Sequence, residues 1–512
     1  MQILNTNELF FKRAAVIFFI GLFVFGSFVF YDYGSCSDEL LYSRLNGEVN
    51  YNFIRTGDSR ELLACSERYH GPAFEIFLFS AEKLFDLTDT RDIYLLRHGL
   101  NFLVFFIAVL FFYLLGLKLF KKHWAALLCS VMLVASPRIF AESFYNSKDL
   151  PMLCFCIIGS YTAFIFIERQ TIGWALIHAV CCAIALDIRI MGLLLPLSTL
   201  YLYAMQKNRK TIPLLFFISY TLVFTIAFWP VLWLNPFYHF IEALRQMSHF
   251  DLNANILYLG KLVSIKNLPW HYLPVWISIT TPICYIVLFL IGLFFALKNS
   301  YANFLSNLPM QFSLFMFATP ILAVIILNST VYNAWRHVYF VYPYLLLIAV
   351  YGFTQLTKAV KKRLFVKIIS LSTLTSILFV YAFMIINHPF QNVYFNSLAG
   401  KNIRQNFELD YWGLSYKQGL EYILANDTSD IIYISDNMGV DLRILPDADR
   451  KRLMFTDVYS NDDPKSVKYF LTNFITHPND YDAGTGTSVF QVKVGNEKIM
   501  EVLKLMPLPN IH

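Results

Sequence analysis

The sequence predicts a polytopic α-helical membrane protein with a small α/β domain at its C-terminal end. Of its 512 residues, 57% are apolar and 15% are charged, whereas a soluble domain carries about 25% charged residues. Apolar runs of the ~20 residues that a bilayer-crossing helix needs recur up to about residue 387. From His388 onward, charged residues and strand-like runs replace them. The chain therefore divides into a membrane domain, residues 1–387, and an outer domain, residues 388–512.

Eleven apolar runs are expected to span the membrane. They cover roughly residues 14–31, 98–118, 124–141, 150–167, 172–187, 191–205, 212–234, 273–297, 309–328, 338–357 and 367–386. The first run follows Lys12 and Arg13 but lacks the small-residue cleavage site of a signal peptide. We therefore expect it to remain as an uncleaved anchor.

The orientation of these runs follows from the Lys and Arg residues in the short loops, which favour the cytoplasmic side. Fifteen such residues lie on the side of the N-terminus and four on the opposite side. We therefore expect the N-terminus in the cytoplasm, and an odd number of spans makes the C-terminal domain extracytoplasmic. Two long loops, about 33–97 and 235–272, then lie on the outer face with it.

The outer domain is expected to have an α/β fold. A helical stretch at Tyr416–Leu424 precedes four strand-like runs, which are Ile431–Ser435, Tyr469–Ile475, Ser488–Val494 and Ile499–Leu505. A domain of this length, residues 388–512, is large enough to hold a core of its own.

The acidic pair Asp38-Glu39 is the first candidate for a catalytic site. It follows the first span within a few residues, where acids are costly unless they line a water-filled cavity. In a helical turn, neighbouring side chains diverge by about 100°, so one of them can face a cavity while the other supports the loop or holds a metal ion. A carboxylate within reach of an attacking hydroxyl serves as a general base, and we predict this role for Asp38.

A second polar turn, residues 146–151, adds Asp149 to the catalytic candidates. Taken alone, Asp149 is also typical of a helix N-cap. Glu39 and Asp149 either hold a divalent cation, Mg²⁺ or Mn²⁺, or form hydrogen bonds only. The sequence leaves these alternatives open.

Four basic residues lie on the outer side against the charge bias: Lys148, Arg189, Arg336 and Arg138. A negatively charged group at the outer surface, such as a lipid phosphate, gives a physical reason for their position. Arg138 follows Pro137 and is also typical of an anchor to lipid headgroups. We predict that the other three converge on one cavity and bind the phosphate.

Six of the eight cysteines lie inside apolar runs, where they are expected as small buried side chains. Cys36 and Cys65 lie instead in the first outer loop. If that loop faces an oxidising compartment, the two thiols can pair. We therefore predict a disulfide between Cys36 and Cys65.

On these residues the chain resembles a known family. An Asp-Glu pair after the first span, an acidic turn between the third and fourth spans and a long second outer loop look like the membrane glycosyltransferases of the GT-C fold. Within them, the chain is most similar to the protein O-mannosyltransferase-like family (family 39 type) and its bacterial relatives, over about residues 10–390. Further residues in matching places are Arg97, Pro137-Arg138 and Trp335-Arg336-His337.

The resemblance implies a hexosyl- or pentosyltransferase of the bacterial inner membrane. Such an enzyme moves a sugar from a polyprenyl-phosphate carrier to an acceptor hydroxyl on a glycan, lipid or protein outside the cytoplasm. It implies Asp38 as the first-loop base and Asp149 as the acid of the second turn. The β-trefoil domain of the eukaryotic protein mannosyltransferases has no counterpart here. The tail motifs Tyr394–Gly400 and Glu408–Gly413 look like those of uncharacterised bacterial members.

The main alternative is a transporter or flippase of lipid-linked sugars. A transporter places ionisable residues near the bilayer midplane, often on broken helices. Here the charged residues collect at one rim of the spans, which favours chemistry at the surface. A third alternative is a noncatalytic assembly factor, for which Asp38 would be dispensable. The modest net charge of +6 gives no support to nucleic-acid binding.

Overall fold

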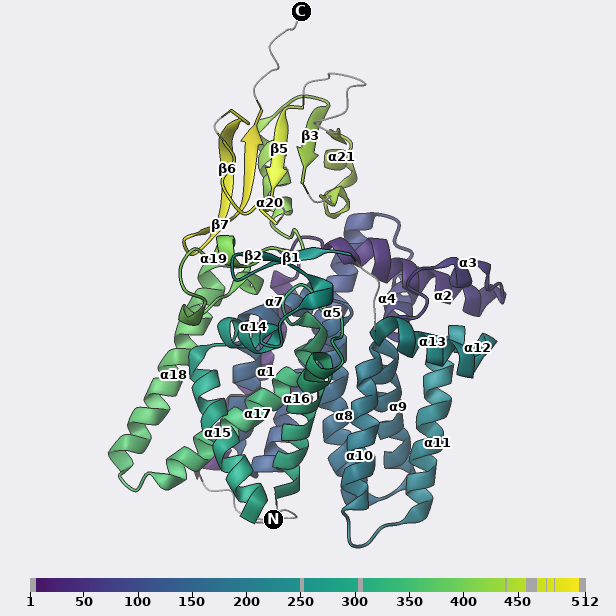
Figure 1. The fold of residues 1–512 in the computed structure, drawn as a ribbon, viewed down its shortest axis with the longest axis vertical. Helices are drawn as coiled ribbons and strands as arrows, with labels where there is room; N and C mark the ends of the chain where they lie inside the picture. Colours follow the sequence, from purple (N-terminus) through teal and green to yellow (C-terminus); the bar gives the residue numbers. More distant parts are fainter. Residues whose placement is uncertain are drawn as a thin grey trace, which may run out of the picture.

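The computed structural model describes residues 6–248, 253–302, 307–437, 440–456, 467–475, 477–482 and 484–505. Helices form a long bundle, and a five-stranded sheet lies beyond one end of it, opposite the N-terminus (Figure 1). We call the end that faces the sheet the outer end of the bundle.

In the described part of the chain, eight helices are long and apolar enough to cross a membrane. They are α1 (Thr6–Val29), α5 (Thr90–Phe120), α8 (Asp149–Arg169), α11 (Thr211–Phe228), α15 (Ile283–Ala302), α16 (Leu308–Ile326), α17 (Tyr342–Ala359) with the preceding 3₁₀ turn η5 (Arg336–Val341), and α18 (Arg363–Ile386). The remaining apolar helices are the bent pair α6 (His123–Val134) and α7 (Pro137–Tyr145), and the shorter α9 (Ile172–Ile188) and α10 (Leu194–Ala204). Together these helices cover all eleven runs that the sequence predicts as spans.

Three of the predicted runs are interrupted rather than straight. The run 124–141 bends by 67° between α6 and α7, just before Pro137. The run 212–234 ends at Phe228, and the short helix α12 (Val231–Leu234) follows Pro230. The run 273–297 divides into α14 (Tyr272–Thr280) and α15 around Pro282. Proline lacks a backbone N–H and disfavours a helical residue before it, which explains each break.

The outer end of the bundle carries the helices of the two long loops (Figure 1). The first loop forms the π-helical turn η1 (Glu39–Arg44), α2 (Leu45–Thr56), α3 (Arg60–Ala64) and α4 (Ala73–Leu84). The second forms α13 (Pro236–Ser248), then the antiparallel hairpin of β1 (Asn255–Tyr258) and β2 (Lys261–Ser264).

The outer domain is built on a sheet in the order β4-β3-β5-β7-β6. Its strands are β3 (Ile432–Asp436), β4 (Leu453–Phe455), β5 (Tyr469–Thr472), β6 (Thr487–Val494) and β7 (Glu497–Lys504), with the helices α19 (Ile403–Asn406), α20 (Tyr416–Asn426) and α21 (Asp447–Arg450). Strand β3 is parallel to both β4 and β5, whereas β5, β7 and β6 are antiparallel. The predicted α/β character is confirmed. The sequence analysis missed β4, which has only three residues.

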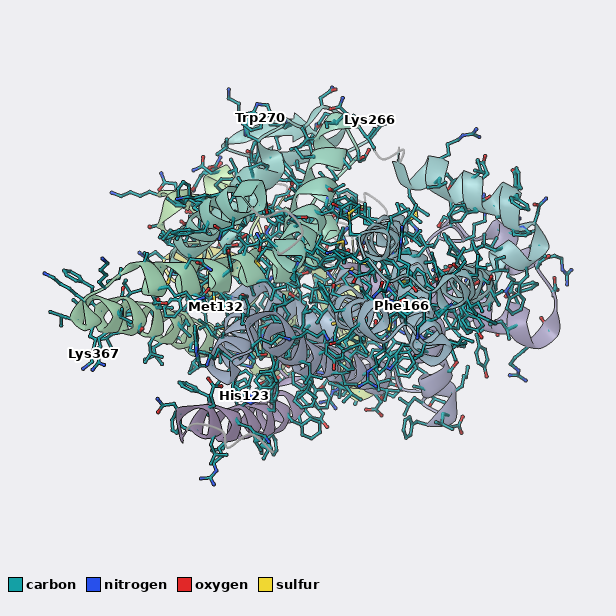
Figure 2. All side chains as sticks on the ribbon, turned by 90° about the horizontal axis from the view of Figure 1, so that it is seen from below. His123, Met132, Phe166, Lys266, Trp270 and Lys367 are labelled. Carbon is teal, nitrogen blue, oxygen red and sulfur yellow. The ribbon has the colours of Figure 1, made fainter. Side chains whose placement is uncertain are left out.

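Apolar side chains fill the bundle and also cover its outside. Figure 2, seen from the N-terminal end, shows Met132 and Phe166 among the packed helices, and both are completely buried. On α18, by contrast, Leu371, Phe379 and Ile386 are 64–79% exposed. An apolar outer surface on a long apolar helix is what a lipid environment requires. The chain is therefore an integral membrane protein.

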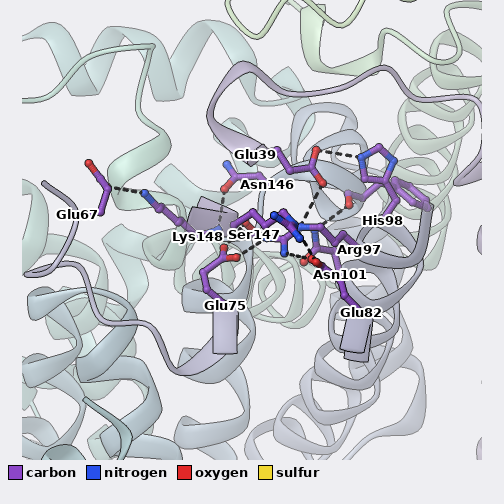
Figure 3. A network of polar contacts seen from close by, with 12 residues as sticks. Glu39, Glu67, Glu75, Glu82, Arg97, His98, Asn101, Asn146, Ser147 and Lys148 are labelled. Carbon is purple, nitrogen blue, oxygen red and sulfur yellow. Dashed lines mark hydrogen bonds and ion pairs between the residues drawn. The ribbon is translucent and has the colours of Figure 1, made fainter. Parts of the chain in front are cut away.

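A buried cation ties the first loop to the bundle. Arg97 on α5 is completely buried and pairs with Glu75 and, at 2.9 Å, with Glu82, both on α4. Its Nε lies 3.8 Å from Glu39 Oε1, and His98 Nε2 lies 3.2 Å from Glu39 Oε2 (Figure 3). Carboxylates from η1 and α4 thus converge on one guanidinium, which fixes both elements against α5.

Replacing Arg97 with Leu should destabilise the protein severely. The change leaves three buried carboxylates without their common cation, and breaking a buried ion pair in this way costs about 3–5 kcal/mol. Thermal unfolding in detergent measures the effect. The control is Arg60→Ala, which removes a solvent-exposed pair with Asp58 and should leave the stability almost unchanged, because solvent screens an exposed ion pair. Equal stability of the two variants would contradict the assignment.

Candidate active site

A cavity of about 310 Å³ lies at the outer end of the bundle. Its volume falls at the lower end of the range of ligand sites. It is lined by Asp38, Tyr42, Glu67, His70, Lys148, Arg189, Met247, Thr330, Tyr332, Arg336, His337 and Tyr411. Of the predicted site residues, Asp38, Lys148, Arg189 and Arg336 thus line one cavity, although up to 298 positions separate them in sequence.

These four side chains meet because each stands where a helix begins or ends. Asp38 precedes η1, and Arg336 begins η5. Lys148 precedes α8, and Arg189 follows the last residue of α9. All these helix ends lie at the same end of the bundle. Segments that are remote in sequence therefore supply one cluster of charges.

Arg336 is the centre of the cluster. Its Nη1 lies 3.4 Å from Asp38 Oδ2 and 3.6 Å from Asp149 Oδ2. Arg189 Nη2 pairs with the other oxygen of Asp149. The Asp149 side chain is 1% exposed and that of Asp38 is 29% exposed. Of these two aspartates, Asp38 is therefore the one that reaches the cavity, while Asp149 lies behind two guanidinium groups.

Asp149 is not the N-cap of α8, so this alternative is wrong. It is the first residue of the helix, and its backbone N–H donates to Asn146 Oδ1 at 2.8 Å. Asn146 Nδ2 also donates to Asp149 Oδ2 at 3.1 Å. Asn146 thereby binds both the backbone N–H and the carboxylate of Asp149 and orients the carboxylate between the two arginines.

Lys148 shares an anion with His70. Glu67 Oε2 lies 3.1 Å from Lys148 Nζ and 3.1 Å from His70 Nδ1. Burial opposes the charge on Glu67, but the His70 hydrogen bond and the Lys148 charge lower its pKa far below the usual range. Burial lowers the pKa of His70 and Lys148 lowers it further, whereas the hydrogen bond with Glu67 opposes this shift. Burial also disfavours the charge on Lys148, but Glu67 and Asp38 offset this effect and raise its pKa.

Glu39 points away from the cavity. It is 1% exposed and contacts Arg97 and His98. The network of Arg97 reaches the second polar turn as well, because Ser147 donates to Glu75 (Figure 3). Glu39 therefore supports the loop on which Asp38 stands.

Glu39 and Asp149 do not fit a joint metal site. Arg97 and His98 lie beside Glu39, and Arg189 and Arg336 lie beside Asp149. A divalent cation prefers six or more oxygen ligands, whereas these two carboxylates sit in separate ion-pair networks. Among the described residues, no group of three or more His, Cys, Asp or Glu side chains is arranged to hold a metal ion.

Arg138 does not line the cavity. It lies on α7, is 5% exposed, and stands over the rings of Trp276 at 5.8 Å and Phe395 at 5.9 Å. The bend before Pro137 turns α7 out of the line of α6, which directs Arg138 to these remote aromatic residues. The structure thus gives no support to Arg138 as a phosphate ligand or a headgroup anchor.

The predicted disulfide between Cys36 and Cys65 is not formed. Both thiols are free and buried. Cys36 packs in the main core, whereas Cys65 packs with Leu62 and Trp229 in a second, smaller cluster. The helices of the first loop hold the two residues in different hydrophobic cores, an arrangement that loop membership alone does not predict.

Most residues that line the cavity were not predicted, and Glu67, Tyr411 and Asp187 are three contributors to the cavity and its walls. Glu67 and Tyr411 line it. Asp187 is completely buried, and its Oδ1 accepts a hydrogen bond from Ala73 N at the start of α4. Beside it, a Cβ on Gly71 would collide with the Asp187 carbonyl group, so only glycine allows the loop after His70 to pack against α9. The motif His70-Gly71-Pro72 was the available signal.

Comparison with known proteins agrees with this architecture. Residues 85–234 match the family model described as dolichyl-phosphate-mannose-protein mannosyltransferase. No curated protein matches the sequence. The crystal structure of ArnT from Cupriavidus metallidurans bound to undecaprenyl phosphate is 14% identical and aligns over 95% of this chain and 97% of its own, with a TM-score of 0.51. The Archaeoglobus fulgidus oligosaccharyltransferase in its apo form is 10% identical and aligns over 87% of this chain and 64% of its own, with a TM-score of 0.53.

These matches establish the fold. The chain has the GT-C fold of membrane glycosyltransferases, as its resemblance to them implied. The family model covers less than a third of the chain.

Proposed function

We propose that the protein is a membrane glycosyltransferase that moves a sugar from a polyprenyl-phosphate carrier to an acceptor hydroxyl. The observation that carries this proposal is the cavity in which one partly exposed carboxylate, Asp38, faces three cations, Arg336, Arg189 and Lys148. Base and anion-binding groups at one site are what transfer from a sugar phosphate requires. The match to the mannosyltransferase model and the undecaprenyl phosphate in the structure of ArnT give independent support.

The reaction assigns a role to each group. The acceptor hydroxyl attacks the anomeric carbon of the donor sugar and transfers its proton to Asp38. The bond from that carbon to the phosphate oxygen breaks, and the carrier leaves as a phosphate. The growing negative charge on the phosphate is stabilised by Arg336, Arg189 and Lys148. Because these cations come from separate elements, they can surround the phosphate.

Both arginines have donors to offer a phosphate. The Nε atoms of Arg189 and Arg336 are buried and make no hydrogen bond in the described structure. A buried donor without a partner is costly. A phosphate in the cavity would satisfy both groups while their other nitrogen atoms remain beside Asp149 and Asp38.

An apolar groove next to the cavity fits the polyprenyl tail. It has a volume of about 500 Å³ and is formed by residues of α9, α10, α11, α12 and α13. Leu186 and Ile241 line the groove, whereas Arg189 and Met247, on or beside the same two helices, line the cavity. A carrier with its phosphate at Arg189 can therefore continue along the groove toward the bilayer.

The acceptor is a hydroxyl of a glycan, a lipid or a protein, and the donor sugar is a hexose or a pentose. The proposed location is the bacterial inner membrane, with the N-terminus in the cytoplasm and the outer domain on the extracytoplasmic side. The transporter alternative has no support, because the described charge cluster lies at one end of the bundle. The ionisable His178 does lie inside α9, but hydrogen bonds with Thr162 and Thr199, at 2.9 Å each, hold its side chain in place.

Replacing Asp38 with Asn should slow transfer about 10²–10⁴-fold, the usual contribution of a general base. Asparagine keeps the shape of the side chain but cannot accept the proton. Mass spectrometry of lipid-linked sugars in a deletion strain identifies the donor that accumulates, and the purified protein is then assayed with it. The same Asp-to-Asn change at exposed Asp58 is the control and should leave turnover normal. Normal turnover in the Asp38→Asn variant would overturn the role of Asp38.

A tryptophan placed in the groove should weaken binding of long-chain donors. Leu222 lines the groove on α11 and is 61% exposed, so Leu222→Trp occupies space meant for the tail. Each CH₂ of the tail that is displaced from the groove loses about 0.8 kcal/mol of binding free energy. We therefore expect KM to rise tenfold or more for an undecaprenyl donor but little for a short-chain analogue. The matched control is Gly21→Trp, which fills a second apolar groove beside α1 and α18. A larger effect of Gly21→Trp would assign the tail to that groove.

Reporter fusions test the orientation. Alkaline phosphatase, which is active only outside the cytoplasm, should be active when fused to the C-terminus and inactive when fused after Lys362. A fluorescent protein that folds only in the cytoplasm should give the opposite pattern. The same compartment at both positions would contradict the arrangement.

A further inference from the structure

A turn at residues 410–415 covers the guanidinium group of Arg336. We call the part of the chain from α18 to α20 that carries this turn the outer segment. The Trp412 ring lies 4.6 Å from the Arg336 Cζ and the Tyr411 ring 6.0 Å from it. Tyr332, from the loop before η5, lies 4.8 Å away. Arg336 is thus surrounded by three aromatic rings, two of which come from beyond the last span.

The turn itself is rigidly held. Asp410 is completely buried and accepts hydrogen bonds from the backbone N–H groups of Leu414 and Ser415. The backbone N–H of Gly413 donates to Asp410 O at 3.1 Å, with a φ of 71° that favours glycine. Asn473, which follows β5, donates to the same carbonyl oxygen at 3.0 Å. The position of Trp412 is therefore fixed by the outer domain.

The outer segment is also fixed to the loop that carries Asp38. A Cβ on Gly34 would collide with the carbonyl oxygen of Leu414, so the two backbones touch only because residue 34 is glycine. Lys417 Nζ donates to the carbonyl oxygen of Tyr31 at 2.7 Å. The turn thus rests on the start of the first loop, a few residues before Asp38.

We propose that Trp412 is a positioning residue that orients Arg336 for the donor phosphate, so that the outer domain completes the phosphate site. The contacts of Arg336 with Asp38 and Asp149 are 3.4 and 3.6 Å long, beyond the 2.7–2.9 Å that is usual for charge-assisted hydrogen bonds. These carboxylates alone do not define the plane of the guanidinium. Aromatic faces do, because a guanidinium both stacks on them and is attracted to them.

This inference rests on the proposed function and deepens it. Removing the aromatic face by Trp412→Leu keeps an apolar side chain but releases the guanidinium. Affinity of the full-length protein for undecaprenyl phosphate should fall about 5- to 30-fold, the range of a desolvated cation–π contact. Trp412→Phe restores a ring and should bind within about threefold of the wild type.

A double-mutant cycle separates positioning from general stability. In an Arg336→Gln background, Trp412→Leu should change the affinity less than about twofold, since the group that it positions is gone. Gly34→Ala, which forces the turn away from the first loop, should reproduce the loss of affinity without changing any aromatic residue. The matched controls are Gly173→Ala, where a Cβ has open space, and Tyr422→Ala, which removes an aromatic pair with Phe490 inside the outer domain. Both should bind as the wild type does.

The outcomes distinguish the inference from the function on which it rests. Normal affinity in Trp412→Leu overturns the inference alone, as does an equal loss in the presence and absence of Arg336. A wild-type protein that neither binds undecaprenyl phosphate nor transfers a sugar overturns the proposed function and the inference with it.

Discussion

The ion pairs of Arg97 are the constraint on which the rest of the outer end depends. A completely buried guanidinium must be compensated, because an unpaired charge in a low-dielectric interior is very costly. Here the compensation comes from Glu39 on η1 and from Glu75 and Glu82 on α4. Because these carboxylates pair with Arg97, the first loop folds back onto α5. Since Asp38 is the neighbour of Glu39 in sequence, the ion pairs of Glu39 also place Asp38 at the cavity.

The same principle extends from Arg97 to the second polar turn. Glu75 accepts from Ser147, and the neighbouring Asn146 orients Asp149 between Arg189 and Arg336. Two neutral side chains of this turn, Ser147 and Asn146, thus lie between the ion pairs of Arg97 and those of Arg189 and Arg336. The second polar turn is therefore held by the residues that fix the first loop as well as by those that face the cavity.

The sequence predicted the parts of this system that depend on local signals. Asp38 and Glu39 were recognisable because acids next to an apolar run require a cavity or a partner. Arg189 and Arg336 stood out against the charge bias. The missed features depend on contacts between remote segments: nothing near Cys65 indicates a second core, and nothing near Trp412 indicates Arg336. Arg138 lies over Trp276 and Phe395 rather than at the cavity, because the bend before Pro137 decides which way its side chain points, and no local signal indicates that direction.

The breaks in the helices explain how a polar site can exist at the rim of a membrane bundle. Irregular backbone is tolerated there only when protein or a water-filled cavity surrounds it. The bend between α6 and α7 directs α7 under the second polar turn, where Glu142 accepts from Tyr339 at 2.5 Å and from Asn146 at 2.8 Å. The loop after α1 is covered in turn by the outer segment, which rests on Gly34. The second polar turn and the loop after α1 are thus both packed against other parts of the chain, and beside them Asp38 faces the three cations in the cavity.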